Sequence, residues 1–169
     1  MVSYLFQAPT GIPGDITRTD ETNVEPAMLI AASTVFAGAF GIPMKYVVGG
    51  IQQFNGGSET KAAFAGVLVR EVPAIGGTGS DTSFAAVPLP TQVQGLAVRG
   101  YITVKCYAGT PARGGTVYVQ IVANGPIPVG AFRADSTDGG NAIALDAVQA
   151  EWATDGVDAD LNAELRIAR

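Results

Sequence analysis

The sequence predicts an all-β protein, a small antiparallel β-sandwich or barrel with an extended N-terminal arm. The 169 residues include 22 glycines and 10 prolines, so turns must be frequent. No segment has a long run of Ala, Leu, Glu and Lys of the kind that propagates a helix, and several short segments show the period of two that is typical of strands. We assign residues 1–26 to the arm and residues 27–169 to a single β domain.

The predicted arm has neither a strand period nor a helix period, and Pro9, Gly11, Pro13 and Gly14 fall within it. It nevertheless carries large apolar side chains that are out of place in a purely solvated tail. These candidate partner-binding residues are Tyr4, Leu5, Phe6, Ile12 and Ile16. We expect them to bury apolar surface against a neighbouring subunit or another protein rather than to stabilise the β domain.

The first half of the β domain is predicted to contain three strand regions and one long loop. Met28–Phe36 is rich in apolar and β-branched residues. Pro43–Val48 and Ile51–Phe54 are separated by two glycines, which predicts a hairpin or a bulged strand. Phe64–Val72 alternates with a period of two, whereas Pro73–Pro90 is the longest non-periodic stretch and is predicted to be a surface loop.

In the second half, Gly100–Tyr107 and Thr116–Ala123 are the clearest strands. Their connector is rich in glycine and contains a proline, so we expect the two strands to form an antiparallel pair. Shorter strands are predicted at Ile127–Arg133, Asn141–Leu145, Glu151–Thr154 and Leu161–Ile167.

Strand alternation also predicts which side chains form the core. The inward residues are Ile102, Val104, Val117, Val119, Ile121, Leu165 and Ile167. Their outward neighbours include Lys105, Gln120 and Arg166. Cys106 shares the inward face, which indicates a buried and inert thiol, and Trp152 is expected to close an edge of the core.

Composition excludes several classes of function. The chain has no histidine, so Ser-His-Asp and Cys-His catalysis and histidine metal sites are impossible. Cys106 is the only cysteine, so there is neither an intrachain disulfide nor a cysteine zinc site. The net charge of −5, without a basic cluster, disfavours nucleic acid as a partner. The most apolar stretch, Ala27–Phe40, is too short to cross a membrane.

Two turns resemble ligand-binding sites, but each lacks a residue pattern that such a site requires. The Gly76–Ser80 loop lacks the Gly-Lys-Ser/Thr ending of a phosphate-binding loop, and no predicted helix follows it. Asp155–Asp160 places three carboxylates in one turn without the EF-hand order, so a solvated acidic turn is favoured over a cation site. A carboxylate dyad for sugar hydrolysis needs a cleft with aromatic walls, and Trp152 is the only tryptophan. We therefore expect neither catalysis nor a cofactor.

Few charges are available to keep the surface soluble. Charged residues make up 15% of the chain, against roughly 25% in an average soluble protein. Because a poorly charged surface associates readily, we expect the protein to bind a partner and to self-associate. The first residues also lack the pattern of a signal peptide, so synthesis in the cytoplasm without export is expected.

Three stretches resemble the structural cement proteins, or head-decoration proteins, of tailed bacteriophages. Phe40–Ile51 is similar to the family's Gly-hydrophobic-Pro-x-Lys segment, and Phe64–Pro73 to its Gly-Val-Leu-Val-Arg strand followed by proline. The third and most specific resemblance runs through Leu96–Lys105, Ala112–Val119, Pro128–Phe132 and Gly139–Asn141. The order and spacing of these pieces carry the resemblance, which covers roughly residues 40 to 145 and is weaker in the arm.

The resemblance implies a β-rich virion protein on the outer surface of a capsid. There it would bind the major capsid protein, often as a homotrimer, and stabilise the shell by bridging capsid subunits. It implies no cofactor and no catalytic residue. An alternative from the residues themselves is a virion-displayed carbohydrate- or receptor-binding β-sandwich module, because such folds commonly hold sugars on aromatic faces.

Overall fold

A computed structural model describes residues 11–30, 40–70, 88, 90–136 and 139–168 of the chain. The strands are β1 (Asn23–Met28), β2 (Pro43–Val47), β3 (Gly50–Gln53), β4 (Phe64–Leu68), β5 (Val93–Lys105), β6 (Tyr118–Gln120), β7 (Phe132–Arg133), β8 (Ala142–Ala144), β9 (Ala150–Trp152) and β10 (Asn162–Ala168). Two short 3-10 helices, η1 (Thr19–Glu21) and η2 (Lys61–Ala63), interrupt them. All the strand pairs are antiparallel, which confirms the predicted all-β class.

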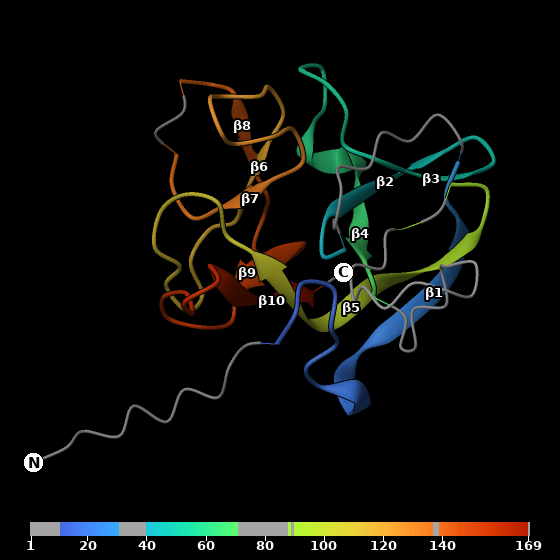
Figure 1. Ribbon diagram of the computed structural model, residues 1–169, viewed down its shortest axis with the longest axis horizontal. Coiled ribbons are helices and arrows are strands. Elements are labelled where there is room, and N and C mark those ends of the chain that lie inside the picture. The colour runs from blue at the N-terminus through green and yellow to red at the C-terminus, as the bar shows by residue number, and fades with distance from the viewer. Residues whose placement is uncertain (1–10, 31–39, 71–87, 89, 137–138, 169) are drawn as a thin grey trace, which may run out of the picture.

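Strand β5 is the centre of the larger sheet, whose order is β3-β2-β4-β5-β10-β9 with β1 added on β5. Ala97 pairs with both β1 and β4, and Arg99 pairs with both β1 and β10. Strands β4 and β10 therefore lie one after the other along one edge of β5, and β1 lies along the opposite edge. Figure 1 shows β5 running across the molecule between β1 and β10.

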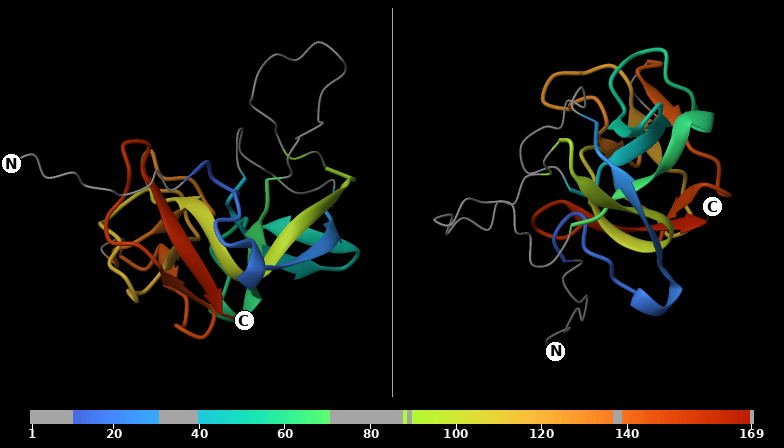
Figure 2. Two further views of the ribbon diagram at one scale, coloured as in Figure 1. Left: turned by 90° about the horizontal axis from the view of Figure 1, so that it is seen from below. Right: turned by 90° about the vertical axis from the view of Figure 1, so that its right-hand side faces the viewer.

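Strand β5 bends at Gly100, whose φ of 113° is a conformation that few other residues adopt. A side chain there would also overlap Thr22. The bend gives β5 the V shape in the left panel of Figure 2, with one lobe of the protein beside each arm of the V. Each lobe has its own core.

The smaller core lies under a strongly curled part of the sheet. There the segment directly after β1 meets β3: Leu29 forms a bridge with Ile51, and the Ile30 amide donates to the Ile51 carbonyl at 3.2 Å. The curled strands enclose Leu29, Phe40, Ile42, Met44, Ile51, Ala65, Leu68, Leu96 and Val98. Strand β4 separates this core from the larger one, because Ala65 and Leu68 face the smaller core while Phe64 and Val67 face the larger.

The larger core packs the second half of β5, β10 and β9 against the three-stranded sheet β7-β6-β8. All seven residues predicted for the core are buried here: Ile102, Val104, Val117, Val119, Ile121, Leu165 and Ile167. Cys106 and Trp152 are also buried, as predicted. The hairpin predicted from Pro43 to Phe54 is confirmed as β2 and β3.

The described part of the predicted arm is hydrogen-bonded into the larger sheet. The Gly14 amide donates to the Thr103 carbonyl at 2.8 Å, and the Thr103 amide donates to the Asp15 carbonyl at 2.9 Å. Ile16 forms a bridge with Ile102 and packs against the larger core. From Gly11 onward the arm therefore covers the edge of β5 that β1 leaves open.

Strand β1 begins at Asn23, inside the segment assigned to the arm. Pro26 is compatible with this strand because β1 pairs with β5 on one side only for most of its length. Most of the strand predicted at Met28–Phe36 lies outside the described residues, as does most of the predicted Pro73–Pro90 loop with its Gly76–Ser80 motif.

The predicted antiparallel pairing of Gly100–Tyr107 with Thr116–Ala123 is wrong. These segments belong to different sheets, and β6 pairs with β7 and β8 instead. The second half of β5 has no free edge for β6, because β10 occupies one edge and residues 14–17 occupy the other.

Two side chains also differ from the predicted strand faces. Gln120 was expected to point outward but is fully buried. Leu161 was expected to begin the last strand, yet it precedes β10 in a turn with a φ of 66° and is 44% exposed.

The pairing of Ile102 with Leu165 gives a direct test of the larger core. Replacing either residue with Ala should lower the free energy of unfolding by about 2 to 4 kcal/mol, because each leaves a cavity. Arg166→Ala is the matched control on the exposed face of β10, with an expected loss of at most about 1 kcal/mol. Denaturant melts that give equal losses for the three variants would contradict this arrangement.

Candidate interaction surface

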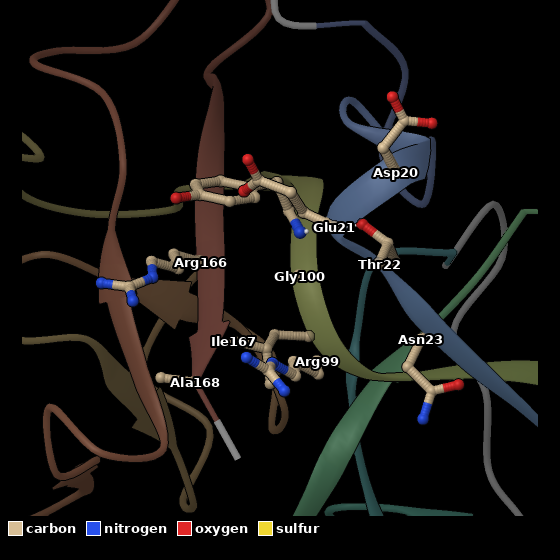
Figure 3. A pocket seen from close by; sticks show the side chains of 10 residues that line it. Asp20, Glu21, Thr22, Asn23, Arg99, Gly100, Arg166, Ile167 and Ala168 are labelled. Carbon is tan, nitrogen blue, oxygen red and sulfur yellow. Dashed lines mark hydrogen bonds between the residues drawn. The ribbon is translucent and has the colours of Figure 1, made fainter.

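A shallow groove crosses β5 at its bend. It has a volume of about 560 Å³ and is lined by η1, the start of β1, residues 99–101 of β5 and the end of β10. We call it the β5 groove; its lining residues are Asp20, Glu21, Thr22, Asn23, Arg99, Gly100, Tyr101, Arg166, Ile167 and Ala168. Figure 3 shows these residues around Gly100, whose missing side chain allows Thr22 to pack directly against β5.

The β5 groove carries charges of both signs. Asp20 and Glu21 come from η1, Arg99 comes from β5, and Arg166 comes from β10 (Figure 3). Arg166 donates to Glu151 at 2.6 Å, and this hydrogen bond raises the pKa of its guanidinium. Within the described part of the chain, the side chains of Asp20, Glu21 and Arg99 form no hydrogen bond or ion pair, although the negative charge of Glu21 also helps to raise the pKa of Arg166.

A second hollow of about 420 Å³ adjoins the first and shares Asn23 and Arg99 with it. Its other lining residues are Glu25, Tyr46 and Val98. The Tyr46 hydroxyl donates to Glu25 at 3.0 Å, which links β2 to β1 across the open part of the curled sheet.

Exposed apolar side chains gather at one end of the smaller lobe. Met28 and Val93 are cross-strand partners and are 47% and 56% exposed. The β2–β3 hairpin reaches the same end, because Gly50 packs directly on the Met28 carbonyl, and Val48 of its turn is fully exposed. We call Met28, Val48 and Val93 the apolar rim.

The predicted partner-binding residues of the arm have different positions. Ile12 is 52% exposed. Ile16 packs against the larger core of the same chain, and Tyr4, Leu5 and Phe6 lie outside the described residues. Sequence reasoning did not find the β5 groove, because its charged residues are far apart in the chain and follow no known motif.

Other candidate sites have structural roles. Burial raises the pKa of the Cys106 thiol, and its Sγ donates to the Ala108 carbonyl at 3.3 Å. Trp152 is only 1% exposed and donates through Nε1 to the Thr116 carbonyl, so its ring is not available to stack on a sugar.

The carboxylates of the Asp155–Asp160 turn accept hydrogen bonds from the chain itself. Asp155 accepts from the Arg113 amide at 2.8 Å, and Asp158 accepts from the amides of Asp160 and Asn162. No three His, Cys, Asp or Glu side chains among the described residues are grouped as metal ligands. The same residues contain no helix that is long and apolar enough to span a membrane.

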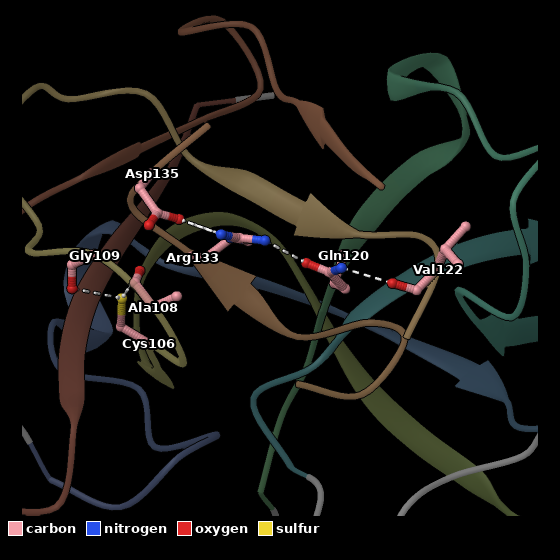
Figure 4. A network of polar contacts seen from close by, with 7 residues as sticks. All are labelled: Cys106, Ala108, Gly109, Gln120, Val122, Arg133 and Asp135. Atoms are coloured by element: carbon pink, nitrogen blue, oxygen red, sulfur yellow. Dashed lines mark hydrogen bonds and ion pairs between the residues drawn. The ribbon is translucent and has the colours of Figure 1, made fainter. Parts of the chain in front are cut away.

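A buried polar network links strands β6 and β7 of the three-stranded sheet. Arg133 donates through Nε to Asp135 at 2.8 Å and through Nη1 to Gln120 at 2.8 Å (Figure 4). The side-chain amide of Gln120 donates in turn through Nε2 to the Val122 carbonyl at 2.6 Å. The Arg133 side chain is only 4% exposed, so this network satisfies a cation and an amide that would otherwise be costly to bury.

Removing one member of this network should be strongly destabilising. Asp135→Ala leaves a buried guanidinium without its carboxylate, with an expected loss of about 3 to 5 kcal/mol in the free energy of unfolding. Lys61→Ala is the control, because Lys61 and Asp146 form an exposed ion pair that should contribute at most about 1 kcal/mol. Equal losses in urea melts would show that the Arg133 network does not stabilise the sheet.

Comparisons with known proteins identify a family. The model of the XM1 gp53 minor capsid protein family matches residues 1–167. A chain in the solved capsid of Myoviridae phage XM1 has a similar fold, with a TM-score of 0.64 over 97% of this chain and 94% of that chain, at 20% identity. No curated protein matches the chain. The predicted relationship to phage structural proteins is thus confirmed, and the chain belongs to the XM1 gp53 minor capsid protein family.

Proposed function

We propose that this protein is a cement, or head-decoration, protein that binds the outer surface of a phage capsid and bridges subunits of the major capsid protein. The observation that carries the proposal is the match of a minor capsid protein family over residues 1–167. A β fold with a small exposed charge content and apolar side chains at its surface suits a protein that works by binding other proteins.

The physical basis of the stabilisation is linkage. A protein that binds the assembled shell but not the separated capsid subunits shifts the equilibrium toward the shell. At a free concentration one hundred times the dissociation constant, each site contributes about 2.7 kcal/mol. Self-association as a homotrimer, which we also propose, would add avidity because one trimer engages several capsid subunits.

The arm is the first proposed contact with the capsid. Gly11 is fixed to β10, because Asn162 donates through Nδ2 to its carbonyl at 3.1 Å. Residues 1–10 therefore start from a defined point beside the exposed Ile12, and ten residues can span at most about 33 to 36 Å. Tyr4, Leu5 and Phe6 could bury their side chains on a neighbouring protein within that reach.

The apolar rim is the second proposed contact. Met28 and Val93 are neighbours across two strands, Val48 lies in the hairpin turn that reaches the same end of the lobe, and all three side chains are exposed within the described part of the chain. The arm leaves the larger lobe, where Gly11 meets β10, whereas the rim belongs to the smaller lobe. Two contacts on different lobes would allow one molecule to bridge capsid subunits.

Deletion of residues 2–10 tests the arm in a head-binding assay. The deletion leaves the hydrogen bonds of Gly14 and Asp15 in place, so thermal unfolding of the isolated protein should be nearly unchanged. The affinity for undecorated heads should fall by about tenfold or more, because burying one large apolar side chain contributes roughly 1.5 to 3 kcal/mol.

Deletion of residues 2–16 is the comparison variant. It also removes the backbone bonds to Thr103 and the Ile16 contact with the larger core, so it should lower the melting temperature clearly. A protein without residues 2–10 that decorates heads with unaltered affinity would contradict the proposed role of the arm.

A further inference from the structure

Three ionisable side chains of the β5 groove form no ion pair within the described part of the chain. Arg18, Lys45, Lys61, Arg133 and Arg166 each form an ion pair within the chain. Of these, Arg166 lines the β5 groove and pairs with Glu151, whereas Asp20 and Glu21 on one side of the groove and Arg99 on the other form no ion pair within the described residues.

The positions of these three residues explain why they do not pair with one another. Asp20 and Glu21 belong to η1, which projects beyond the edge of the sheet beside β1 (Figures 1 and 2). Arg99 is held on β5 by its pairing with both Asn23 and Ala168. The two sides of the β5 groove are thus fixed by backbone pairing, and their exposed charges, which water solvates in the free chain, are accessible to a partner.

A second copy of the chain has the required charge pattern. We propose that the β5 groove is a contact between copies of this protein, in which Arg99 of one copy pairs with Asp20 and Glu21 of another. Each copy presents both acidic and basic side chains, so the contact would form ion pairs with side chains from both copies. The projecting η1 supplies the carboxylates, and the groove between η1 and Arg99 is open at the surface.

This contact is compatible with closed symmetry. It can be reciprocal about a two-fold axis, or it can repeat around a three-fold axis with Arg99 facing one neighbour and η1 facing the other. The inference deepens the self-association within the proposed function and rests on it. It names the surface and the residues that the association would use.

Charge reversal tests the contact by sedimentation velocity at low ionic strength. Arg99→Glu and Glu21→Lys should each weaken self-association by roughly tenfold or more, because each places like charges opposite one another. The variant with both changes keeps the net charge of the chain and should recover most of the lost affinity. An equimolar mixture of the two single variants should also associate more tightly than either alone.

Matched controls separate a specific contact from a change in net charge. Arg113→Glu and Asp160→Lys make the same charge changes at exposed side chains outside the β5 groove, and should leave association unchanged. Added salt should reduce the difference between the groove variants and the wild type, because exposed charges are screened.

Three results would overturn the contact: a monomeric wild type, groove variants that behave like the controls, or a double variant that stays as weak as the single ones. Head binding by the same variants is measured separately and bears on the capsid role alone. Wild-type protein that associates through the β5 groove but binds no heads would leave this contact in place and overturn the decoration role.

Discussion

The pairing of β5 along both of its edges is the constraint on which the rest of the structure depends. This 13-residue strand has β4 and β10 along one edge, and β1 with residues 14–17 along the other. Because both edges are occupied over most of its length, β6 has to form a separate sheet with β7 and β8. The bend at Gly100 then divides the molecule into two lobes with separate cores.

The same constraint connects the fold to its surfaces. The bend at Gly100 creates the floor of the β5 groove, and pairing on both sides of β5 fixes Arg99 opposite η1. Residues 14–17 cover an edge that would otherwise be open to pairing with another chain. The same contacts fix the position at which residues 1–10 join the β domain.

Local patterns in the sequence predicted the local parts of this structure. The period of two identified the buried faces of β5 and β10, and two glycines identified the β2–β3 hairpin. The pairing of β5 could not be predicted in this way, because its partners come from both ends of the chain and from β4. Gln120 was misassigned for a similar reason: its burial depends on Arg133 from another strand.

The candidate surfaces were predictable only in part. Ile12 of the arm is exposed and remains a proposed contact residue, whereas Ile16 packs against the larger core of its own chain. The charged residues of the β5 groove come together only through the three-dimensional pairing of β1, β5 and β10. Membership of a minor capsid protein family gives the protein a structural role in the virion, and decoration of the outer surface is its proposed form.

The most direct test of the decoration role is electron cryomicroscopy of phage heads assembled with and without this protein. We predict density of the two-lobed fold on the outside of the shell, in contact with more than one major capsid subunit, and its absence from heads that lack the protein. Density confined to the interior, or contact with a single capsid subunit only, would contradict the account.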